Sequence, residues 1–429
     1  MKLFAHQIDA LDRTANKNRV AYYHDMGLGK TYTGAEKMRE LGAAVNLVIC
    51  QKSKVGDWLD HFKKYYPGYE LFDLTDKKQL VAFMDLVKSP MIDLKIIVGV
   101  INYDLVYRRP ELLNMQQFTL MLDESSIIQN ETIKRSRFIM RLKYKNLILL
   151  SGTPTGGKYE RLYSQLKMLG YDIRKTAFYN MYVISHIEQI GGYRGPAIKY
   201  RVIDGYKNVD HLKRKMRRLG CDFLKTNEVM DLPGQQFNRV NVPTTKYYNQ
   251  FKKAKMVVVD GVEIVSETIL TDMLYLRQLC GAYCADKLQA FSDLLDSTDD
   301  GLIVFYNFNN ELVKLREVAK DHDRPISEIN GTTKDLSAYD DNNNAVVLVQ
   351  YQAGAMGLNL QKYNKLVYFT PPLSSELYEQ SKKRIHRLNQ TQTCFYYNLI
   401  CKNSIEENIY KTLEMRKDYT NELFKMEKI

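Results

Sequence analysis

Short apolar segments recur through the first half of the chain, and each is followed by turn residues or by a helical pattern. The segments are VNLVIC (45–50), LKIIVGVI (94–101), FTLML (118–122) and LILL (147–150). They are apolar on both faces and long helical stretches separate them, which is typical of buried parallel strands joined by crossover helices. The pattern predicts a doubly wound α/β domain.

A second set of apolar segments follows a long middle region that is mostly helical and basic. Its members are GLIVFY (301–306), AVVLVQ (345–350), KLVYF (365–369) and CFYYNLI (394–400). Because this set repeats the pattern of the first, we expect an α/β protein with two tandem lobes. Each lobe is predicted to be a mostly parallel sheet flanked by helices, with a helical insertion between the lobes.

The boundary between the two lobes is expected after residue 218. Residues 1–218 then form lobe 1 with a helical extension, and residues 219–429 hold the hinge, a helical segment and lobe 2. The hinge is expected within 219–234, where Pro233 and Gly234 interrupt a helical pattern.

The composition is that of an ordinary soluble protein. Of the 429 residues, 45% are apolar and 26% are charged, and the length suits two or three domains. The N-terminal segment lacks an unbroken apolar core, and no window approaches the ~20 apolar residues that a membrane span needs. We therefore expect a cytoplasmic protein, in the host cytoplasm if the source is viral, with no membrane partner.

The cysteines give no sign of a metal or disulfide framework. They are Cys50, Cys221, Cys280, Cys284, Cys394 and Cys401. Two of them are spaced to lie one helical turn apart, but no second pair stands nearby in the sequence to complete a tetrahedral zinc site. We expect reduced thiols in the core.

The formal net charge of +12 and the isoelectric point of about 9.1 indicate a polyanionic partner, for which nucleic acid is the commonest choice. Much of the excess is local, in KNVDHLKRKMRR (207–218) and KKRIHR (382–387). Taken alone, each run is interpreted as a solvated helix face.

The segment YYHDMGLGKTYT (22–33) predicts a phosphate-binding loop between a strand and a helix. Gly27 and Gly29 allow close approach of the backbone, Lys30 supplies a cation, and the hydroxyl of Thr31 can ligate Mg²⁺. One departure is His24, which stands where the general P-loop spacing asks for glycine. The alternative is a glycine-rich turn that only caps a helix.

Two further segments end apolar strands with polar residues. In LMLDESS, Asp123 can hold Mg²⁺ and Glu124 can polarise the water that attacks a γ-phosphate, at the sheet edge where open α/β sheets place ligands. In LILLSGTPTGG, the residues from Ser151 to Pro154 could sense the γ-phosphate at the same edge. A solvated acidic pair and a plain strand-to-helix turn are the alternatives.

In this order, the segments DMGLGKT, DESSIIQN, LLSGTP and EQSKKRIHRLNQ resemble superfamily 2 helicases, and more narrowly their Swi/Snf-type, chromatin-remodeller-like ATPase branch. CQKSKVGDWLDHF (50–62), with the single tryptophan Trp58, FLKTNEVMDLPG (223–234), LYLRQLCGAY (274–283), YQAGAMGLNL (351–360) and the C-terminal 396–417 extend the match over nearly the whole chain. The resemblance implies two RecA-like lobes with ATP hydrolysed in the cleft between them.

The resemblance also implies the site residues, with ATP and Mg²⁺ as cofactors. The catalytic set is Lys30, Glu124, Arg384 and Arg387. The nucleotide-binding set is Gln7, as reader of the adenine, Met26, Gly27, Leu28, Gly29, Lys30, Thr31, Gly357 and Gln380, and the metal set is Thr31 and Asp123. The candidates for contact with nucleic acid are Lys52, Ser53, Asn102, Tyr103, Asn307, Gly354 and Asn359.

The basic segment EQSKKRIHRLNQ also carries an expectation of its own. On a helix, Gln380, Arg384 and Arg387 fall at i, i+4 and i+7 and so share one face. Two guanidiniums presented together suit the charge on a transferring phosphoryl group, and an arginine finger contributes roughly 10³ to 10⁵ in rate. The alternative is a basic surface helix that touches nucleic acid.

Some positions depart from the pattern of the branch. Gln350 and Tyr351 stand where small hydroxyl residues are favoured, and Ser125 and Ser126 stand where alanine and histidine are usual. A histidine that couples hydrolysis to nucleic-acid engagement is absent from its usual place, so the coupling is expected to be weaker or to run through other residues.

The resulting expectation is a DNA-stimulated ATPase that moves along or remodels duplex DNA, gripping its backbone. The compact outline favours a prokaryotic or phage-like member that acts in replication, recombination or repair, with protein partners from those processes and as a monomer when free. The alternatives are an RNA helicase, a poorly hydrolysing nucleotide-gated clamp or scaffold, and a P-loop kinase for a small molecule.

Overall fold

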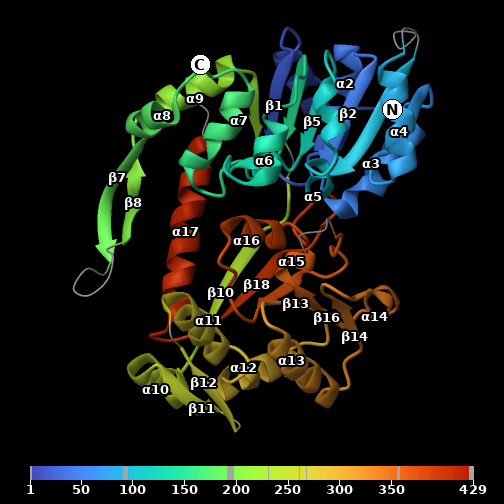
Figure 1. The fold of residues 1–429 in the computed structure, drawn as a ribbon. Helices are drawn as coiled ribbons and strands as arrows, with labels where there is room; N and C mark the ends of the chain where they lie inside the picture. The colour runs from blue at the N-terminus through green and yellow to red at the C-terminus, as the bar shows by residue number, and fades with distance from the viewer. Residues whose placement is uncertain are drawn as a thin grey trace. The chain divides into compact units, whose positions relative to one another are not determined.

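The computed structural model describes residues 2–89, 95–190, 198–229, 231–259, 261–266, 268–354 and 358–424. The chain divides into two compact units, of which the first comprises Met1–Val229 with Asp418–Ile429 and the second Met230–Lys417. Each unit is a sheet covered by helices (Figure 1). In the part of the chain that is described, no helix combines the length and the apolar character needed to cross a bilayer.

The first unit is built on a seven-stranded sheet in the order β3-β4-β2-β5-β6-β1-β9, in which every pairing is parallel. Its strands are β1 (Arg19–His24), β2 (Val45–Cys50), β3 (Tyr69–Asp73), β4 (Ile96–Asn102), β5 (Thr119–Asp123), β6 (Asn146–Leu150) and β9 (Cys221–Leu224). The four apolar segments of the first set coincide with β2, β4, β5 and β6, so the predicted parallel α/β lobe is confirmed.

Helices cover both faces of this sheet. They are α1 (Ala5–Arg13), α2 (Lys30–Leu41), α3 (Val55–Tyr65), α4 (Lys77–Val87), α5 (Tyr103–Val106), α6 (Lys134–Ile139), α7 (Tyr163–Met168), α8 (Lys175–Tyr182) and α9 (Val209–Arg218). Alternate residues of β1 enter different cores: Val20 and Tyr22 pack with Trp58, whereas Ala21 and Tyr23 belong to the opposite core. This alternation is the reason why the strands are apolar on both sides.

The second unit repeats the design around a sheet in the order β10-β18-β17-β13-β16-β14-β15, which is parallel except for the β14–β15 pair. Its strands are β10 (Gln235–Val242), β13 (Leu302–Tyr306), β14 (Ile326–Ile329), β15 (Lys334–Asp335), β16 (Val346–Gln350), β17 (Lys365–Tyr368) and β18 (Cys394–Cys401). The second set of apolar segments coincides with β13, β16, β17 and β18. The expected pair of tandem α/β lobes, each a mostly parallel sheet flanked by helices, is confirmed.

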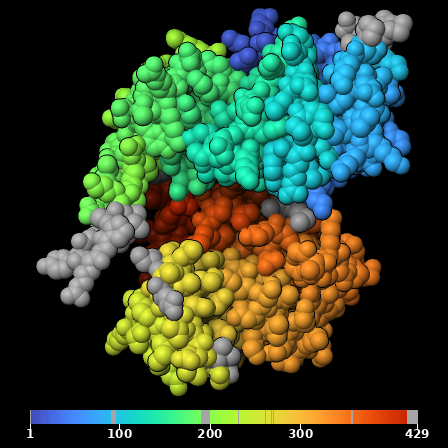
Figure 2. All heavy atoms as spheres, viewed as in Figure 1, coloured from blue at the N-terminus to red at the C-terminus, as the bar shows by residue number. Residues whose placement is uncertain are grey.

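The helices of the second unit flank their sheet (Figure 1), and the space-filling view shows the atoms of this unit from orange-yellow to red (Figure 2). The helices are α10 (Lys246–Ala254), α11 (Ile269–Cys280), α12 (Ala285–Asp296), α13 (Asn309–Asp321), α14 (Ser337–Asp341), α15 (Tyr351–Gly354), α16 (Ser375–Lys382) and the part of α17 (Ile405–Phe424) up to Lys417. The middle of the chain, expected to be helical, also contains two antiparallel hairpins. These are β7 (Val183–Ile190) with β8 (Ile198–Tyr206), and β11 (Met256–Val259) with β12 (Val262–Val265).

The two units divide after Val229, later than the boundary expected after residue 218. The reason is β9, which pairs in parallel with β1 from Ala21↔Cys221 to His24↔Leu224 and so belongs to the first sheet. A 3-10 helix, Thr226–Glu228, follows β9. The part of the chain that leads to the second unit therefore runs beside the loop that follows β1.

Candidate active site

The glycine-rich loop joins the end of β1 to the start of α2. Gly27 and Gly29 have φ angles of 87° and 70°, which glycine adopts without strain. Gly29 is the N-cap of α2, and no side chain caps this helix end. The first turn therefore presents backbone N–H groups and the positive end of the helix dipole, the arrangement that suits a phosphate.

Lys30 folds back over this loop. Its Nζ donates to the carbonyl oxygens of His24, at 2.9 Å, and of Asp25, at 3.2 Å. The turn after β6 lies against the same ammonium group, since a Cβ atom on Gly152 would be 3.4 Å from Nζ of Lys30 and 3.2 Å from Cγ of Met26. The LILLSGTP segment and the glycine-rich loop thus meet at one edge of the sheet.

Gln7 of α1 contacts the back of the loop. Its Nε2 donates to the carbonyl oxygens of Leu28 (3.3 Å) and Gly29 (3.2 Å), and His6 Nε2 lies 3.1 Å from the carbonyl oxygen of Leu28. A Cβ atom at Gly29 would lie 2.4 Å from Gln7 Nε2, so the Gln7 side chain would have to move, and the φ of 70° at this position also favours glycine. Gln7 is therefore beside the predicted nucleotide loop, and its reading of adenine stays a prediction.

Asp123 ends β5 at the same edge. Trp58 of α3 donates its indole N–H to Asp123 Oδ2 at 2.9 Å, and Tyr103 donates its hydroxyl to the backbone oxygen of Asp123 at 3.0 Å. Burial raises the pKa of Asp123, against the lowering effect of the Trp58 N–H and of the nearby Lys30. A carboxylate held this way, which forms no direct ion pair with any residue that the structure describes, fits a divalent cation.

Glu124 follows in a left-handed conformation, with φ of 58°. A non-glycine residue rarely adopts this conformation, and such strain is typical of functional sites. Ser151 donates its hydroxyl to Glu124 Oε2 at 3.4 Å, which joins the acidic segment to the turn after β6. The two residues expected to carry metal binding and water activation therefore sit next to the loop that holds Lys30.

Gln165 of α7 was not expected from the sequence, yet it ties three parts of the site together. Its Oε1 accepts the hydroxyls of Ser125 (2.8 Å) and Tyr23 (3.0 Å), and its Nε2 donates to the carbonyl oxygen of Pro154 (2.8 Å). Ser125, which replaces the alanine usual in the branch, thus forms a buried link between the acidic segment and the turn after β6. No local sequence signal marks this glutamine.

A second unexpected feature supports the start of the loop. The side chain of His24 is fully buried, and its Nε2 lies 2.7 Å from Asp222 Oδ2 in β9. Arg13 donates to both carboxylate oxygens of Asp222, at 2.7 and 3.0 Å. The only sequence signal was an aspartate inside the short apolar segment CDFL, which indicates a buried charge that needs partners.

Asp25, the residue after His24, is held by the segment that follows β9. Thr226 donates both its hydroxyl, at 3.1 Å, and its backbone N–H, at 3.3 Å, to Asp25 Oδ2. The carbonyl groups of His24 and Asp25 hold the ammonium group of Lys30. The side chains of these two residues are in turn held by residues 222–226. We call residues 222–226 the β9 strut.

In the second unit, Arg384 and Arg387 both donate to the carbonyl oxygen of Leu358, each at 3.4 Å. The structure brings the two guanidiniums together, but the helix predicted for this segment covers only its first four residues. α16 ends at Lys382 and both arginines lie in the turns that follow. Burial lowers the pKa of Arg387. Gln380, at the end of α16, donates to Glu376 (3.4 Å), and Gly357 lies outside the described residues.

The candidates for nucleic-acid contact divide by exposure. Lys52, Ser53 and Asn359 are exposed. Asn102 and Tyr103 are 2% and 3% exposed, so their side chains face the inside of the lobe. Contact with nucleic acid stays a prediction for all of them, and the geometry favours the exposed three.

The two remaining candidates lie in the second unit. Asn307 uses its amide to bind Thr370 and the carbonyl oxygen of Pro371. Gly354 is buried against Phe305, and a Cβ atom there would lie 2.7 Å from Val349. Gly354 is therefore part of the packing behind the surface, whereas Asn307 is half-buried.

One group of possible metal ligands lies in the core of the second unit. Donor atoms of Cys280, Cys401 and Glu406 lie within 4.8 Å of one another. Both oxygens of Glu406 already accept Lys287 Nζ, at 2.7 and 2.6 Å. All six cysteines are free, in line with the expectation of reduced thiols.

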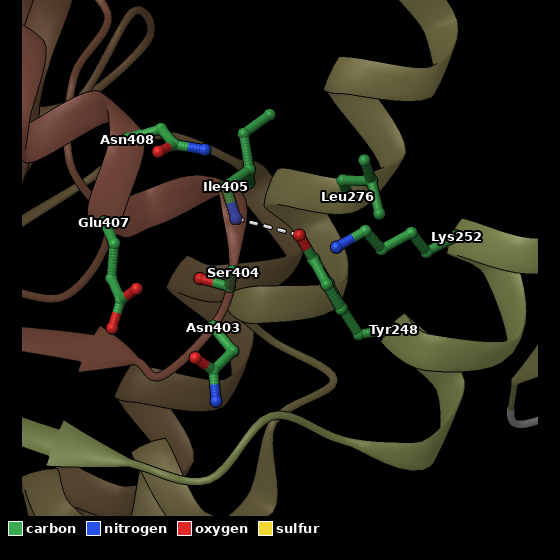
Figure 3. A pocket seen from close by; sticks show the side chains of 8 residues that line it. All are labelled: Tyr248, Lys252, Leu276, Asn403, Ser404, Ile405, Glu407 and Asn408. Carbon is green, nitrogen blue, oxygen red and sulfur yellow. Dashed lines mark hydrogen bonds between the residues drawn. The ribbon is translucent and has the colours of Figure 1, made fainter.

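A pocket of about 470 Å³ opens beside the first turn of α17 (Figure 3). Tyr248 projects into it and accepts the backbone N–H of Ile405 at 2.8 Å. Lys252 and Glu407 both line the pocket, so its charge is mixed. Its residues belong to none of the predicted nucleotide motifs.

Two sequence models of protein families match the chain, one after the other. The first is the SNF2-related domain, over residues 11–284, and the second is the helicase conserved C-terminal domain, over residues 286–389. The first alone covers more than half of the chain. The chain belongs to the SNF2-related family.

Relatives within the SNF2-related family differ in size. The chain is 23% identical to the ISWI chromatin-remodeling complex ATPase ISW1 of Saccharomyces cerevisiae, over 94% of this chain and 39% of that protein. It is 22% identical to the RAD54-like DNA repair and recombination protein of Drosophila erecta, over 95% of this chain and 60% of that protein. The chain therefore spans about two fifths of the length of the yeast relative and three fifths of the length of the Drosophila relative.

A relative of more similar length is the probable global transactivator of Orgyia pseudotsugata multicapsid polyhedrosis virus, which is 20% identical over 93% of this chain and 86% of that protein. Among solved structures, the SWI2/SNF2 ATPase core of Sulfolobus solfataricus in complex with dsDNA is 20% identical, with a TM-score of 0.45 over 98% of this chain and 92% of that one.

Proposed function

We propose that this chain is a motor that hydrolyses ATP and uses the energy to move along or remodel DNA, in replication, recombination or repair. The observation that carries the proposal is the convergence of Lys30, Asp123 and Gly152 at one sheet edge, in a member of the SNF2-related family that also matches the helicase C-terminal domain. The names of the relatives, among them remodelling ATPases and a repair protein, support DNA as the partner.

In this proposal the first unit binds MgATP. The N–H groups at the start of α2 and the ammonium of Lys30 hold the phosphates, and Thr31 and Asp123 hold Mg²⁺. Mg²⁺ neutralises charge on the phosphates as it develops. Glu124, held by Ser151, orients and polarises the attacking water. Gln7 stays close to the loop and contacts the base.

We further propose that Arg384 and Arg387 stabilise the charge on the transferring phosphoryl group. Their shared contact with the Leu358 carbonyl oxygen keeps the two guanidiniums together, as a bidentate clamp requires. Arg384→Lys and Arg387→Lys are expected to lower turnover by at least 10²-fold while nucleotide binding changes little, because an arginine finger acts on the transition state. Equal losses of turnover and of nucleotide affinity would instead assign these arginines to ground-state binding.

The experiment that tests the function is ATP turnover measured with duplex DNA, single-stranded DNA and RNA of matched sequence, and without nucleic acid. We expect the strongest stimulation by duplex DNA, falling steeply with salt because the contacts are to phosphates. Stronger stimulation by RNA would replace the proposal with an RNA helicase. Turnover without any stimulation would indicate an enzyme of another class, such as a small-molecule kinase.

Glu124→Gln separates a motor from a nucleotide-gated clamp. An enzyme should lose turnover and keep its affinity for ATP, because the amide cannot polarise the water yet preserves the shape of the site. A clamp that hydrolyses poorly should show the same DNA affinity and the same low turnover in both forms. Ser151→Ala is the matched control, since it removes the hydroxyl that Glu124 accepts without removing the carboxylate.

The remaining parts of the proposal concern the oligomeric state, the protein partners and the compartment. We propose a monomer that is recruited by replication or recombination proteins and works in the cytoplasm, of the host if the source is viral. A mass measurement in solution, with and without DNA, tests whether the protein is a monomer. Capture of proteins on the Glu124→Gln variant, which should keep its nucleotide, tests whether such partners bind.

A further inference from the structure

The amino ends of three neighbouring strands carry basic residues. β6, β1 and β9 are adjacent and parallel in the first sheet, and they begin at Asn146, Arg19 and Cys221. The chain that enters each strand must therefore lie at the same edge of the sheet. The glycine-rich loop and the turn after β6 follow the carboxyl ends of these strands, so the two edges are opposite.

Contacts show that the entering segments form one continuous surface. Lys17 Nζ donates to the backbone oxygen of Arg218 (3.3 Å), and Asn18 donates its amide to the backbone oxygen of Lys145 (3.2 Å). The guanidinium of Arg19 lies 5.4 Å from the ring centre of Tyr144. Tyr144 and Arg19 both reach the carbonyl oxygen of Met168, the residue after Lys167.

We call this surface the amino-edge surface. It is formed by the basic residues of these segments, which are Lys17, Arg19, Lys143, Lys145, Lys167, Lys215, Arg217 and Arg218. Most of them are exposed, and the others are half-buried. In the described part of the chain, only Lys167 among the eight forms an ion pair, with Asp172 at 3.2 Å.

Some basic side chains elsewhere on the first unit are matched by acids. Arg39 pairs with Glu36, Lys95 with Glu70, and Lys175 with Glu131. Unmatched charges of one sign repel one another and destabilise a fold, so a surface that concentrates them indicates a partner of opposite charge. The spread of flexible lysines and arginines suits a row of phosphates and carries no means of reading bases.

We propose that the amino-edge surface binds the backbone of a second segment of nucleic acid, at the edge of the first unit opposite the nucleotide loop. The proposal rests on the proposed function only for the choice of nucleic acid as the polyanion. The surface would hold one stretch of duplex while the motor acts on another, which would tether the protein to DNA between steps.

The test compares two triple variants that remove the same charge. Lys17→Gln, Lys145→Gln and Arg218→Gln change the amino-edge surface, whereas Arg39→Gln, Lys95→Gln and Lys175→Gln remove matched cations elsewhere on the unit. Binding of a short fluorescent duplex is measured by anisotropy across salt concentrations without nucleotide. We expect the slope of log K against log salt to fall by roughly 3 in the first variant, one unit for each phosphate contact, and to change little in the second.

Stoichiometry supplies the decisive readout. With short duplexes in excess, the wild type and the control variant should bind two per chain, and the amino-edge variant one. A single duplex on every form, or equal slopes for the two triple variants, would overturn the proposal. Loss of binding to polyglutamate, with duplex binding unchanged, would also overturn it in favour of an acidic protein.

ATP turnover without nucleic acid keeps this inference separate from the proposed function. All three forms should share the same basal rate and melting temperature, because none of the six residues contacts the loop or the acidic segment. If the protein proves not to hydrolyse ATP, the loss of the second duplex in the amino-edge variant would still stand. If it hydrolyses ATP but binds a single duplex, only the inference fails.

Discussion

Trp58 donates its indole N–H to Oδ2 of Asp123 across 2.9 Å, although 65 positions separate the two residues in the chain. Trp58 is buried to 1% exposure and stacks on Phe62 in α3, so its ring cannot turn away from the carboxylate. The indole thereby fixes the orientation of the carboxylate that is proposed to hold Mg²⁺. A neighbour that orients a metal-binding carboxylate typically contributes 10- to 100-fold in metal affinity.

Trp58→Phe should therefore weaken the response to Mg²⁺. The variant keeps most of the packing and loses the N–H donor, so we expect the Mg²⁺ concentration for half-maximal ATP turnover to rise about 10- to 100-fold. Titration of Mg²⁺ at saturating ATP checks the prediction. Phe62→Leu is the control, because it disturbs the same stack without touching the hydrogen bond. An equal rise in both variants would reduce Trp58 to a packing role.

Trp58 is also the single tryptophan of the chain, so its fluorescence reports on one place. Because the indole is bonded to Asp123, capture of Mg²⁺ by that carboxylate should change the polarity around the ring. We expect a change in emission on addition of Mg²⁺ with a non-hydrolysable ATP analogue, and none with the analogue in Lys30→Ala. An unchanged spectrum, with binding shown independently by calorimetry, would place the metal away from Asp123.

The β9 strut links the loop around Lys30 to the last part of the first unit. Thr226→Val removes the hydroxyl that Asp25 accepts and keeps the shape of the side chain. We expect a loss of about 1 kcal/mol in stability. The KM for ATP should rise several-fold with kcat less affected, since the carbonyl oxygen of Asp25 holds Nζ of Lys30.

Asp222→Asn extends this test to the buried side of the strut. It weakens the bonds to Arg13 and His24, and we expect a cost of about 1 to 3 kcal/mol in the free energy of unfolding. Steady-state kinetics and denaturant unfolding separate the two effects. If stability falls in both variants while KM for ATP stays constant, the strut supports the fold and does not position the lysine.

The sheets could be predicted from sequence because their strands are buried on both faces. A run such as VNLVIC has few alternatives once long helical stretches flank it, and it coincides with β2. β9 was not predicted because it is only four residues long and contains Asp222, whose burial depends on Arg13 and His24 far away in the chain. Local patterns carry no information about such partners.

The arginine segment shows why the shape of a site is harder to predict than its chemistry. The spacing of Arg384 and Arg387 fits a helix, but two successive turns also bring such positions together. Here Arg384 donates its backbone N–H to Ser381, and both side chains reach the carbonyl oxygen of Leu358. The acceptor is available only because residues 358–360 pack against the arginine segment. The sequence pattern therefore predicted the pair of charges but not the backbone carbonyl that holds them.

Glu311 provides the test that depends on pH. Its Oε2 accepts the backbone N–H groups of Asn307 and Phe308, at 2.8 and 3.1 Å, and the hydroxyl of Thr370 at 3.0 Å. The side chain is fully buried, and burial raises its pKa to about 7, against the lowering effects of these bonds and of Lys287. The carboxyl therefore caps the start of α13 while carrying a proton over much of the acidic range.

The sign of the effect follows from linkage. Between the unfolded pKa of about 4.3 and the folded pKa of about 7, the folded state holds a proton that the unfolded state releases. The stability that this group contributes is therefore fully present below the lower value and is lost as pH rises to about 7, by up to about 4 kcal/mol. Glu311→Gln mimics the protonated form and should abolish this trend.

Denaturant unfolding of wild type and Glu311→Gln from pH 5 to pH 8.5 measures the difference between their free energies of unfolding. The contributions of the other titrating groups cancel in this difference. We expect wild type to lose stability relative to the variant up to about pH 7 and to run parallel to it above. Thr370→Val serves as a control, because it removes one donor to the carboxylate and so should leave the folded pKa at least as high. A constant difference between wild type and Glu311→Gln across the range would mean that Glu311 is ionised throughout, with a pKa near its ordinary value.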